Sequence, residues 1–292
     1  MVIQSLRLWV TIKPIATPVL WILGISAAVG ALATYFTTTT IAAAIFNVAF
    51  ILVTLIAVCL VISKERNRAL QVEQRNSELF HIVSENIHNA HHLIRDALFD
   101  LEHADAGIVR ERAKNTAKDL VNLLAGLLSK LTGCYVCVCI KIPEQFEGVT
   151  ARSIDDLEGK NVLTFCRDRI NTPGKRWEQW YHSLVDNSVF RDIILGKIPY
   201  FTSADLEKEK DYTNMTPNWR QWYKTAIVVP IRRTVSHSDK GNPKYELLGF
   251  LCADSLTTEA FGEKQIDDYA QLLMSVGDGL YLYFDEVRKL DA

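Results

Sequence analysis

Ile41 to Ile62 reads IAAAIFNVAFILVTLIAVCLVI, an uncharged apolar run of 22 residues that is followed, after Ser63, by Lys64-Glu65-Arg66. At a rise of about 1.5 Å per residue, a helix of this length extends roughly 33 Å, enough to cross a hydrocarbon core of about 30 Å. The alternative is a helix buried in a soluble core. We favour a membrane span because a second apolar run lies directly upstream.

This second run, Ile15–Phe36, is separated from the first only by the four threonines Thr37–Thr40. It is too long for the apolar part of a cleaved signal peptide, so residues 1–63 are predicted to form a two-span transmembrane α-hairpin, with spans at about 15–36 and 41–62. Basic residues flank the hairpin at its two outer ends: Arg7, Lys13, Lys64, Arg66 and Arg68. The positive-inside rule then predicts a multi-pass protein of the cell inner membrane with both termini in the cytoplasm.

Asn47 is the strongly polar side chain of the second span. Polar groups in lipid usually face another helix, where a hydrogen bond contributes roughly 0.6–2 kcal/mol. One interpretation of Asn47 is therefore a contact between subunits or the lining of a pore. The other is a side chain that reaches the headgroup region.

The composition is that of an apolar segment joined to an ordinary globular remainder. The 292 residues carry a formal charge of −2, and this balance gives no electrostatic reason to expect nucleic-acid binding. Six cysteines lie at positions 59, 134, 137, 139, 166 and 252. Five of them fall in the predicted cytoplasmic part, where thiols stay reduced, so we expect no structural disulfide.

A helical connector is expected after the second span. From Glu65 to Leu101 the chain has neither glycine nor proline, and from Phe80 onward apolar residues recur every three or four positions, which predicts a helix with one packed stripe. A second helix is expected over Ala113–Leu131, ending at Gly133. We therefore divide the chain into the hairpin (1–63), a helical or coiled-coil connector (64–106) and a cytoplasmic domain (107–292).

After Gly133 the pattern becomes one of strands. Four runs rich in β-branched and aromatic residues predict strands: Cys134–Ile142, Asn161–Cys166, Thr225–Arg232 and Glu246–Ala253. Helical patches are expected between the second and third of these, at Trp177–Val185 and Val189–Leu195, and an amphipathic helix at Ile266–Val287. The expected fold class is α+β, an antiparallel sheet with flanking helices, preceded by the connector and the transmembrane hairpin.

Three segments of this domain resemble the GAF-domain family. Leu247–Ser255 is similar to the glycine-containing strand before the closing helix of GAF domains, Asn187–Ile194 to their central helix, and Ala226–Ile231 to a strand ending in a proline-containing motif. The resemblance covers about residues 107–290. It implies a GAF-like antiparallel sheet, a small-molecule pocket between the sheet and the helical insert, and dimerisation through flanking helices. The signature of cyclic-nucleotide-binding members is not found here, which argues against classical cyclic AMP or cyclic GMP binding.

Aromatic and basic side chains gather between the second and third predicted strands. The pairs Trp177/Trp180 and Trp219/Trp222 each have arginine or lysine beside them, and planar rings with nearby cations suit a nucleotide or another flat anionic ligand. The alternative is that these rings only cap the core. The residues expected to contact the ligand are Phe165, Arg167, Asp168, Trp180, Tyr181, Phe201, Trp222 and Asp254.

No catalytic motif is found in the sequence, so we expect no enzyme activity, no cofactor and no metal. Two groups of residues leave metal binding open as an alternative. His88 and His92 lie four residues apart on one helical face. Cys134, Cys137 and Cys139 lie on the first strand, with Cys166 and Cys252 on the strands that neighbour it in the GAF arrangement, so this group leaves a metal or redox cluster open. The ordinary interpretation is solvated histidines and cysteines packed in the core.

The predicted function is that of a membrane-bound cytoplasmic sensor, whose GAF-like domain binds a small ligand and signals through helices to a partner protein or the membrane. The expected partners are the lipid bilayer, a small molecule, for which a nucleotide is one candidate, and further copies of the chain in a homodimer or higher homo-oligomer. One alternative is a nucleotide-triggered effector of a bacterial defence system, in which the hairpins form a pore or disrupt the membrane. The other is a scaffold for oligomerisation.

Overall fold

The computed structural model describes residues 40–103, 105–143, 147–170, 181–214, 218–237 and 243–291, together with Trp21 and Gly24. The chain forms two compact units, residues 1–80 and 81–292. The boundary between them falls within helix α2 (Thr40–Glu102). Apart from Trp21 and Gly24, the predicted first span at residues 15–36 lies outside the described residues.

The first unit contains the amino-terminal part of α2. The predicted second span is helical throughout. Among the described residues, one helix, Val48–Glu102, is long and apolar enough to cross a membrane, with a mean hydropathy of 2.3 over its apolar window. Its large apolar side chains are exposed, among them Ile51, Val53 and Leu55. Asn47 belongs to α2, but its side chain is outside the part that the structure describes.

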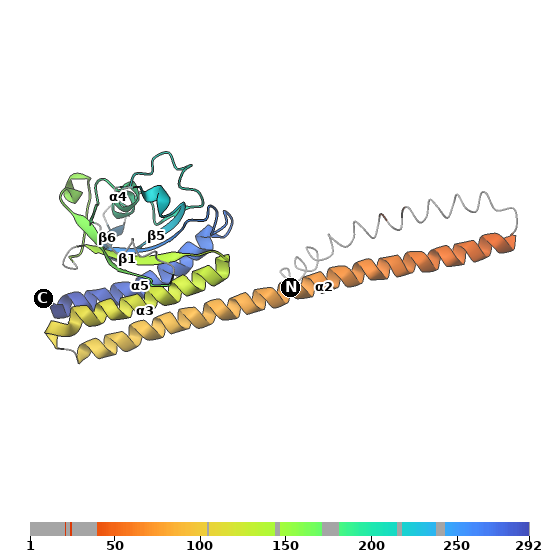
Figure 1. Ribbon diagram of the computed structural model, residues 1–292, viewed down its shortest axis with the longest axis horizontal. Helices are drawn as coiled ribbons and strands as arrows, with labels where there is room; N and C mark the ends of the chain where they lie inside the picture. Colours follow the sequence, from red (N-terminus) through yellow and green to blue (C-terminus); the bar gives the residue numbers. More distant parts are fainter. Residues whose placement is uncertain are drawn as a thin grey trace. The chain divides into compact units, whose positions relative to one another are not determined.

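The described residues of the second unit contain a six-stranded antiparallel sheet (Figure 1). In chain order the strands are β1 (Cys137–Pro143), β2 (Asn161–Arg167), β3 (Tyr181–Ser183), β4 (Phe201–Ser203), β5 (Thr225–His237) and β6 (Pro243–Ser255). Their order across the sheet is β3-β2-β1-β6-β5-β4. The two central strands are therefore β1 and β6, and every residue of β1 is buried.

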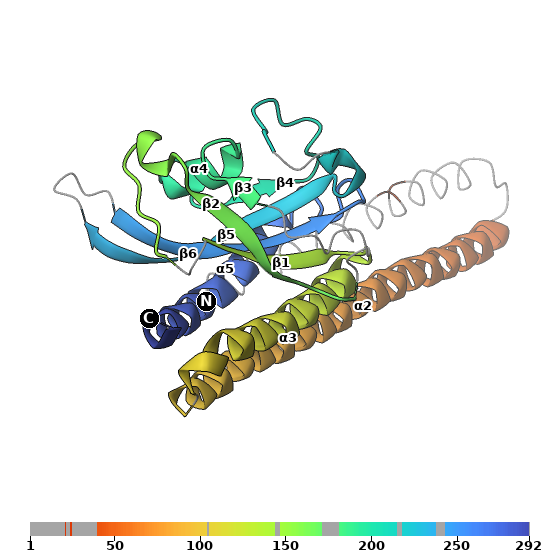
Figure 2. The ribbon, with the colours of Figure 1, turned by 60° about the vertical axis from the view of Figure 1, so that its left-hand side comes forward.

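Helices cover both faces of this sheet. Helices α3 (Ala106–Thr132) and α5 (Ile266–Asp291) pack on one face, and the short α4 (Ser188–Ile194) lies over the other, as Figure 1 and Figure 2 show. Helix α3 ends as predicted, because Gly133 adopts the left-handed conformation (φ 68°) and its N–H donates to the Ser129 carbonyl. Helix α4 begins after Asn187, whose Oδ1 accepts a hydrogen bond from the Phe190 N–H at 3.1 Å.

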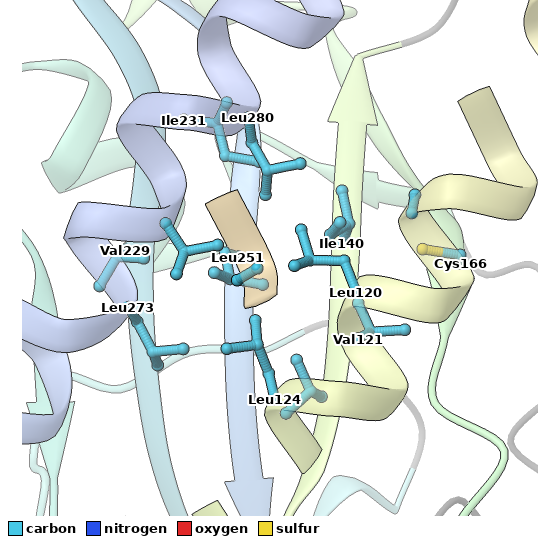
Figure 3. Close-up of a cluster of buried hydrophobic side chains, with 14 of the residues drawn as sticks. Leu120, Val121, Leu124, Ile140, Cys166, Val229, Ile231, Leu251, Leu273 and Leu280 are labelled. Atoms are coloured by element: carbon cyan, nitrogen blue, oxygen red, sulfur yellow. The ribbon is translucent and has the colours of Figure 1, made fainter. Parts of the chain in front are cut away.

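The main hydrophobic core fills the space between the sheet and the helices α3 and α5 (Figure 3). It is formed by side chains from both layers, including Leu120, Leu124, Ile140, Val229, Leu251, Leu273 and Leu280. Ala90, Ile94 and Leu101, from the last turns of α2, belong to the same core. The packed stripe predicted for the connector is confirmed at these three positions.

The α+β class, the antiparallel sheet and the flanking helices are confirmed, with the ends of the elements shifted by a few residues. One prediction was wrong where the structure describes it. Part of the helical patch expected at Trp177–Val185 is strand β3, because Tyr181–Ser183 pairs with the edge of β2. Strand β4 was not predicted, since three residues on a sheet edge are too short for a periodic pattern.

Gly249 allows the two central strands to approach closely. A Cβ atom at this position would lie 2.4 Å from the carbonyl oxygen of Lys141 on β1. We expect Gly249→Ala to lower the free energy of unfolding by about 1–3 kcal/mol, because the backbones would have to separate. Denaturant unfolding of the full chain in detergent measures this change.

The matched control is Gly126→Ala in α3, where a Cβ would meet nothing within 4 Å. A helix-interior alanine should leave stability unchanged or raise it by up to about 1 kcal/mol. Equal effects of the two substitutions would contradict the close approach at Gly249.

Candidate functional site

A cavity of about 80 Å³ lies on the sheet face opposite α3 and α5. Its walls come from all six strands of the sheet, from α4, and from the segment between β4 and β5. Phe201, Asn214 and Trp222 line it and are themselves partly exposed, so the cavity reaches the surface. This is the location that the GAF resemblance implies, between the sheet and the helical insert.

The floor of the cavity is polar. Cys139 and Lys141 project into it from β1, Arg167 from β2, and Cys252 and Asp254 from β6. The strand register places Arg167 directly opposite Cys139, and Cys139 directly opposite Cys252. A guanidinium and two thiols therefore form a row across three neighbouring strands.

A β-bulge in β2 brings Arg167 into this row. The partner of Ile140 is Cys166, but the partner of the next residue, Lys141, is Thr164, so the register skips Phe165, which is the extra residue of the bulge. Phe165 and Cys166 consequently both belong to the core under α3 and α5. Arg167 then returns to the cavity face, which a regular alternation would not allow.

Lys141 is 6% exposed, and its ammonium group is held by two neighbours. Its Nζ lies 3.1 Å from Oγ1 of Thr164 and 2.6 Å from Nε2 of His182. Burial, followed by the charges of Lys141 and Arg167, lowers the pKa of His182 to about 2. Because an ammonium group only donates, Nε2 of the neutral imidazole accepts, and the ring proton lies on Nδ1.

Arg167 is the side chain with the largest unmet hydrogen-bonding capacity here. Its Nε and Nη1 are buried and have no hydrogen-bond partner among the described residues. Nδ1 of His182 is also buried and has no hydrogen-bond partner among the described residues. Buried donors without acceptors destabilise a protein by about 1–3 kcal/mol each, and more when they are charged.

Aromatic rings form the opposite wall of the cavity. Phe201 stacks on Tyr212 with ring centroids 5.9 Å apart, and Trp222 and Tyr223 also line the space. Asn214 donates to the hydroxyl of Tyr212 at 2.8 Å, and burial raises the pKa of that tyrosine to about 12. Trp219, which forms a predicted pair with Trp222, does not line the cavity. It is buried in a small cluster with Tyr223 and Leu206.

Four of the eight predicted ligand contacts, Arg167, Phe201, Trp222 and Asp254, line the cavity. Three others lie elsewhere: Phe165 packs on the helix side, 5.7 Å from the ring of Phe284, and Tyr181 is 58% exposed on the edge strand. Asp168 is fully buried and accepts from the Val138 N–H at 2.8 Å, which ties β2 to β1. Trp180 lies outside the described residues.

Four further side chains line the cavity but were not predicted as ligand contacts: Lys141, His182, Cys139 and Cys252. Lys141 carries a usable signal, because it is the one charged residue in the run Cys134–Ile142 and alternates in phase with Cys137 and Cys139. His182 has no sequence signal that would have identified it as a cavity residue, since its place in the cavity depends on the pairing of β3 with β2.

Metal-binding geometry is not found in the part of the chain that the structure describes, where no three histidine, cysteine or acidic side chains converge. Nε2 of His88 and Nε2 of His92 are 2.8 Å apart on the exposed side of α2. Cys166 is separated from Cys139 and Cys252 because it faces the helices.

Comparisons with known proteins give similarity in solved structures alone. No protein-family model matches the sequence, and no curated protein is significantly similar. The GAF domain of a phosphoenolpyruvate-protein phosphotransferase from Coxiella burnetii is similar over 70% of this chain and 97% of its own, at 13% identity and a TM-score of 0.38. The GAF domain of a phosphoenolpyruvate-protein phosphotransferase from Acinetobacter is similar over 66% of this chain and 90% of its own, at 9% identity and a TM-score of 0.36. The reduced form of fRMsr of Staphylococcus aureus is similar over 64% of this chain and 95% of its own, at 13% identity and a TM-score of 0.28.

The low pKa of His182 predicts a pH dependence of stability. Unfolded histidine takes up a proton near pH 6.5, whereas the folded side chain stays neutral down to about pH 2. Since the unfolded state binds more protons below pH 6.5, stability falls there by about 1.4 kcal/mol per pH unit. Between pH 6.5 and 5, wild type should therefore lose about 2 kcal/mol more than His182→Gln in detergent-solubilised unfolding experiments. Parallel pH profiles would contradict a neutral buried imidazole.

Proposed function

We propose that the chain is a membrane-anchored receptor for a small organic anion, which binds in the cavity beside Arg167. The observation that carries this proposal is the guanidinium of Arg167, whose buried Nε and Nη1 have no hydrogen-bond partner among the described residues. A ligand with several acceptor oxygens, such as a carboxylate or phosphate group, satisfies such donors through charge-assisted hydrogen bonds.

The electrostatics of the floor favour an anion. Lys141 and Arg167 contribute two positive charges, and His182 is neutral at every physiological pH because burial and these two cations lower its pKa to about 2. Asp254 is the acidic side chain of the described lining. The Lys141 ammonium is fixed by Thr164 and His182 before a ligand arrives, so little side-chain ordering remains to oppose binding.

The size of the cavity restricts the ligand. Its volume of about 80 Å³ is well below the roughly 300 Å³ at which sites for drug-sized molecules begin. The dimensions favour a small acid with a flat or apolar part that contacts Phe201 and Trp222. A nucleotide, the candidate drawn from the sequence, would need the aromatic wall to move.

The sheet connects such a site to the helices. Cys139 and Lys141 face the cavity, whereas Val138 and Ile140, on the same strand, face α3 and α5. A ligand that shifts β1 therefore acts on the helix layer through adjacent residues. This arrangement supports the sensor interpretation, in which the signal passes to a partner protein or to the membrane.

Membrane anchoring is supported by the exposed apolar side chains of α2 near Ile51 and Leu55. We place both spans in the cell inner membrane, with both termini in the cytoplasm, on the distribution of basic residues in the sequence. The assembly into a homodimer or higher homo-oligomer stays a prediction. The two alternative functions, a nucleotide-triggered membrane effector and an oligomerisation scaffold, also stay predictions.

Arg167→Leu should weaken anion binding by about 10- to 100-fold, the loss expected for a charged hydrogen-bonded contact of about 1.5–3 kcal/mol. The measurement is isothermal titration of the detergent-solubilised chain with acetate, lactate, succinate, inorganic phosphate and AMP. Arg169→Leu is the matched control, because Arg169 has the same charge but is exposed outside the cavity.

The proposal fails if none of these anions binds wild type, or if Arg169→Leu weakens binding as much as Arg167→Leu. Binding of AMP alone, with no small acid bound, would replace the small-acid ligand by a nucleotide.

The predicted topology gives a separate test of the membrane assignment. In intact cells, a membrane-impermeant maleimide should label Thr38→Cys, in the predicted outer loop, in a background where Cys134 is serine. Wild-type Cys134 should be labelled only after the cells are permeabilised. Labelling of Cys134 in intact cells would reverse the orientation.

A further inference from the structure

The cavity holds a pair of cysteines that the proposed anion site does not use. Cys139 on β1 and Cys252 on β6 are directly opposed in the strand register. Both thiols are free and both line the cavity, where Cys139 is 2% and Cys252 7% exposed. We propose that these two thiols are a modification site for a small hydroperoxide, which converts them into a reversible cross-strand disulfide.

The spacing of the pair is compatible with a disulfide. Directly opposed residues of antiparallel strands have Cα atoms about 4.5–5.5 Å apart. Disulfides span Cα separations of about 4.4–6.8 Å. Both side chains line the same cavity from directly opposed positions, so the two thiols face each other across the paired strands. Bond formation therefore requires no change of register.

Cys139 has the surroundings of a nucleophilic thiol. Arg167 is its direct neighbour on β2, and Lys141 lies two residues further on the same face of β1. The hydrogen bond from Cys252, together with these two cations, lowers the pKa of the Cys139 thiol to about 6 in spite of its burial. The same hydrogen bond and burial raise the pKa of Cys252. The two sulfurs thus have different roles, with Cys139 as the attacking thiolate and Cys252 as the resolving thiol.

The reaction proceeds in two balanced steps. The Cys139 thiolate attacks the terminal oxygen of the hydroperoxide, the O–O bond breaks, and Cys139 becomes a sulfenic acid while the alkoxide leaves and takes up a proton. The Cys252 sulfur then attacks the Cys139 sulfur, the S–S bond forms, and water leaves with the oxygen and the Cys252 proton. The two thiols lose two electrons, and the hydroperoxide is reduced to an alcohol and water.

Cys166 provides a comparison within the same sheet. It is on β2, next to β1, but the bulge directs it into the core under α3 and α5. Burial raises the pKa of its thiol. Both its location and its protonation state exclude it from the reaction in the cavity.

The test treats the full chain in detergent, without added anion, with hydrogen peroxide and then with an alkylating reagent under denaturing conditions. Peptide mass spectrometry should show Cys139 and Cys252 joined, with the loss of two hydrogen masses, and a thiol reductant should restore both. Cys166→Ser should leave this disulfide unchanged. Cys252→Ser should stop the reaction at a sulfenic acid on Cys139, which dimedone captures.

The proposal is overturned if Cys139 and Cys252 stay alkylatable after oxidation in wild type, or if another cysteine pair is joined. Capture of the sulfenic acid at Cys252 in a Cys139→Ser variant, with none at Cys139 in Cys252→Ser, would also overturn the assigned roles. Because the wild-type mapping needs no anion and no variant, its result is independent of ligand binding at Arg167.

Discussion

The antiparallel pairing of β1 with β6 determines both faces of the domain at once. With Cys139 opposite Cys252, Ile140 lies opposite Leu251, so one face of the pair is a polar cavity floor and the other belongs to the hydrophobic core. A shift of one residue would exchange these faces and bury Lys141 among leucines. The cost of burying an unpaired ammonium makes such a shift unfavourable, so the lysine helps to fix the register.

Much of the fold follows from periodic sequence patterns. The heptad-like spacing before Gly133 predicts α3 and its left-handed end, and the long β-branched runs predict the central strands. The site is less predictable, because Lys141 could have been found from its alternation with Cys139, but His182 could not. Strand β3 is three residues long and forms only because β2 offers an edge. Such pairing is a tertiary effect that local propensity does not contain.

Phe165 and Asp168 show how one irregularity limits sequence-based site prediction. Strict alternation along β2 places Phe165 and Arg167 on the same face, but the bulge places them on opposite faces. Asp168 is charged and close to the site in sequence, yet it is used to hold the backbone of β1. Residue type and proximity therefore selected four side chains that line the cavity, and only the strand geometry separates cavity-facing from structural side chains.

The same bulge has a consequence for the chemistry beside Cys139. In a regular β2, Cys166 instead of Arg167 would lie opposite Cys139, and three thiols from adjacent strands would form one row with Cys252. Three converging thiolates are a ligand set suited to a soft metal ion. The bulge therefore decides whether the residue beside Cys139 on β2 is a guanidinium or a third thiol.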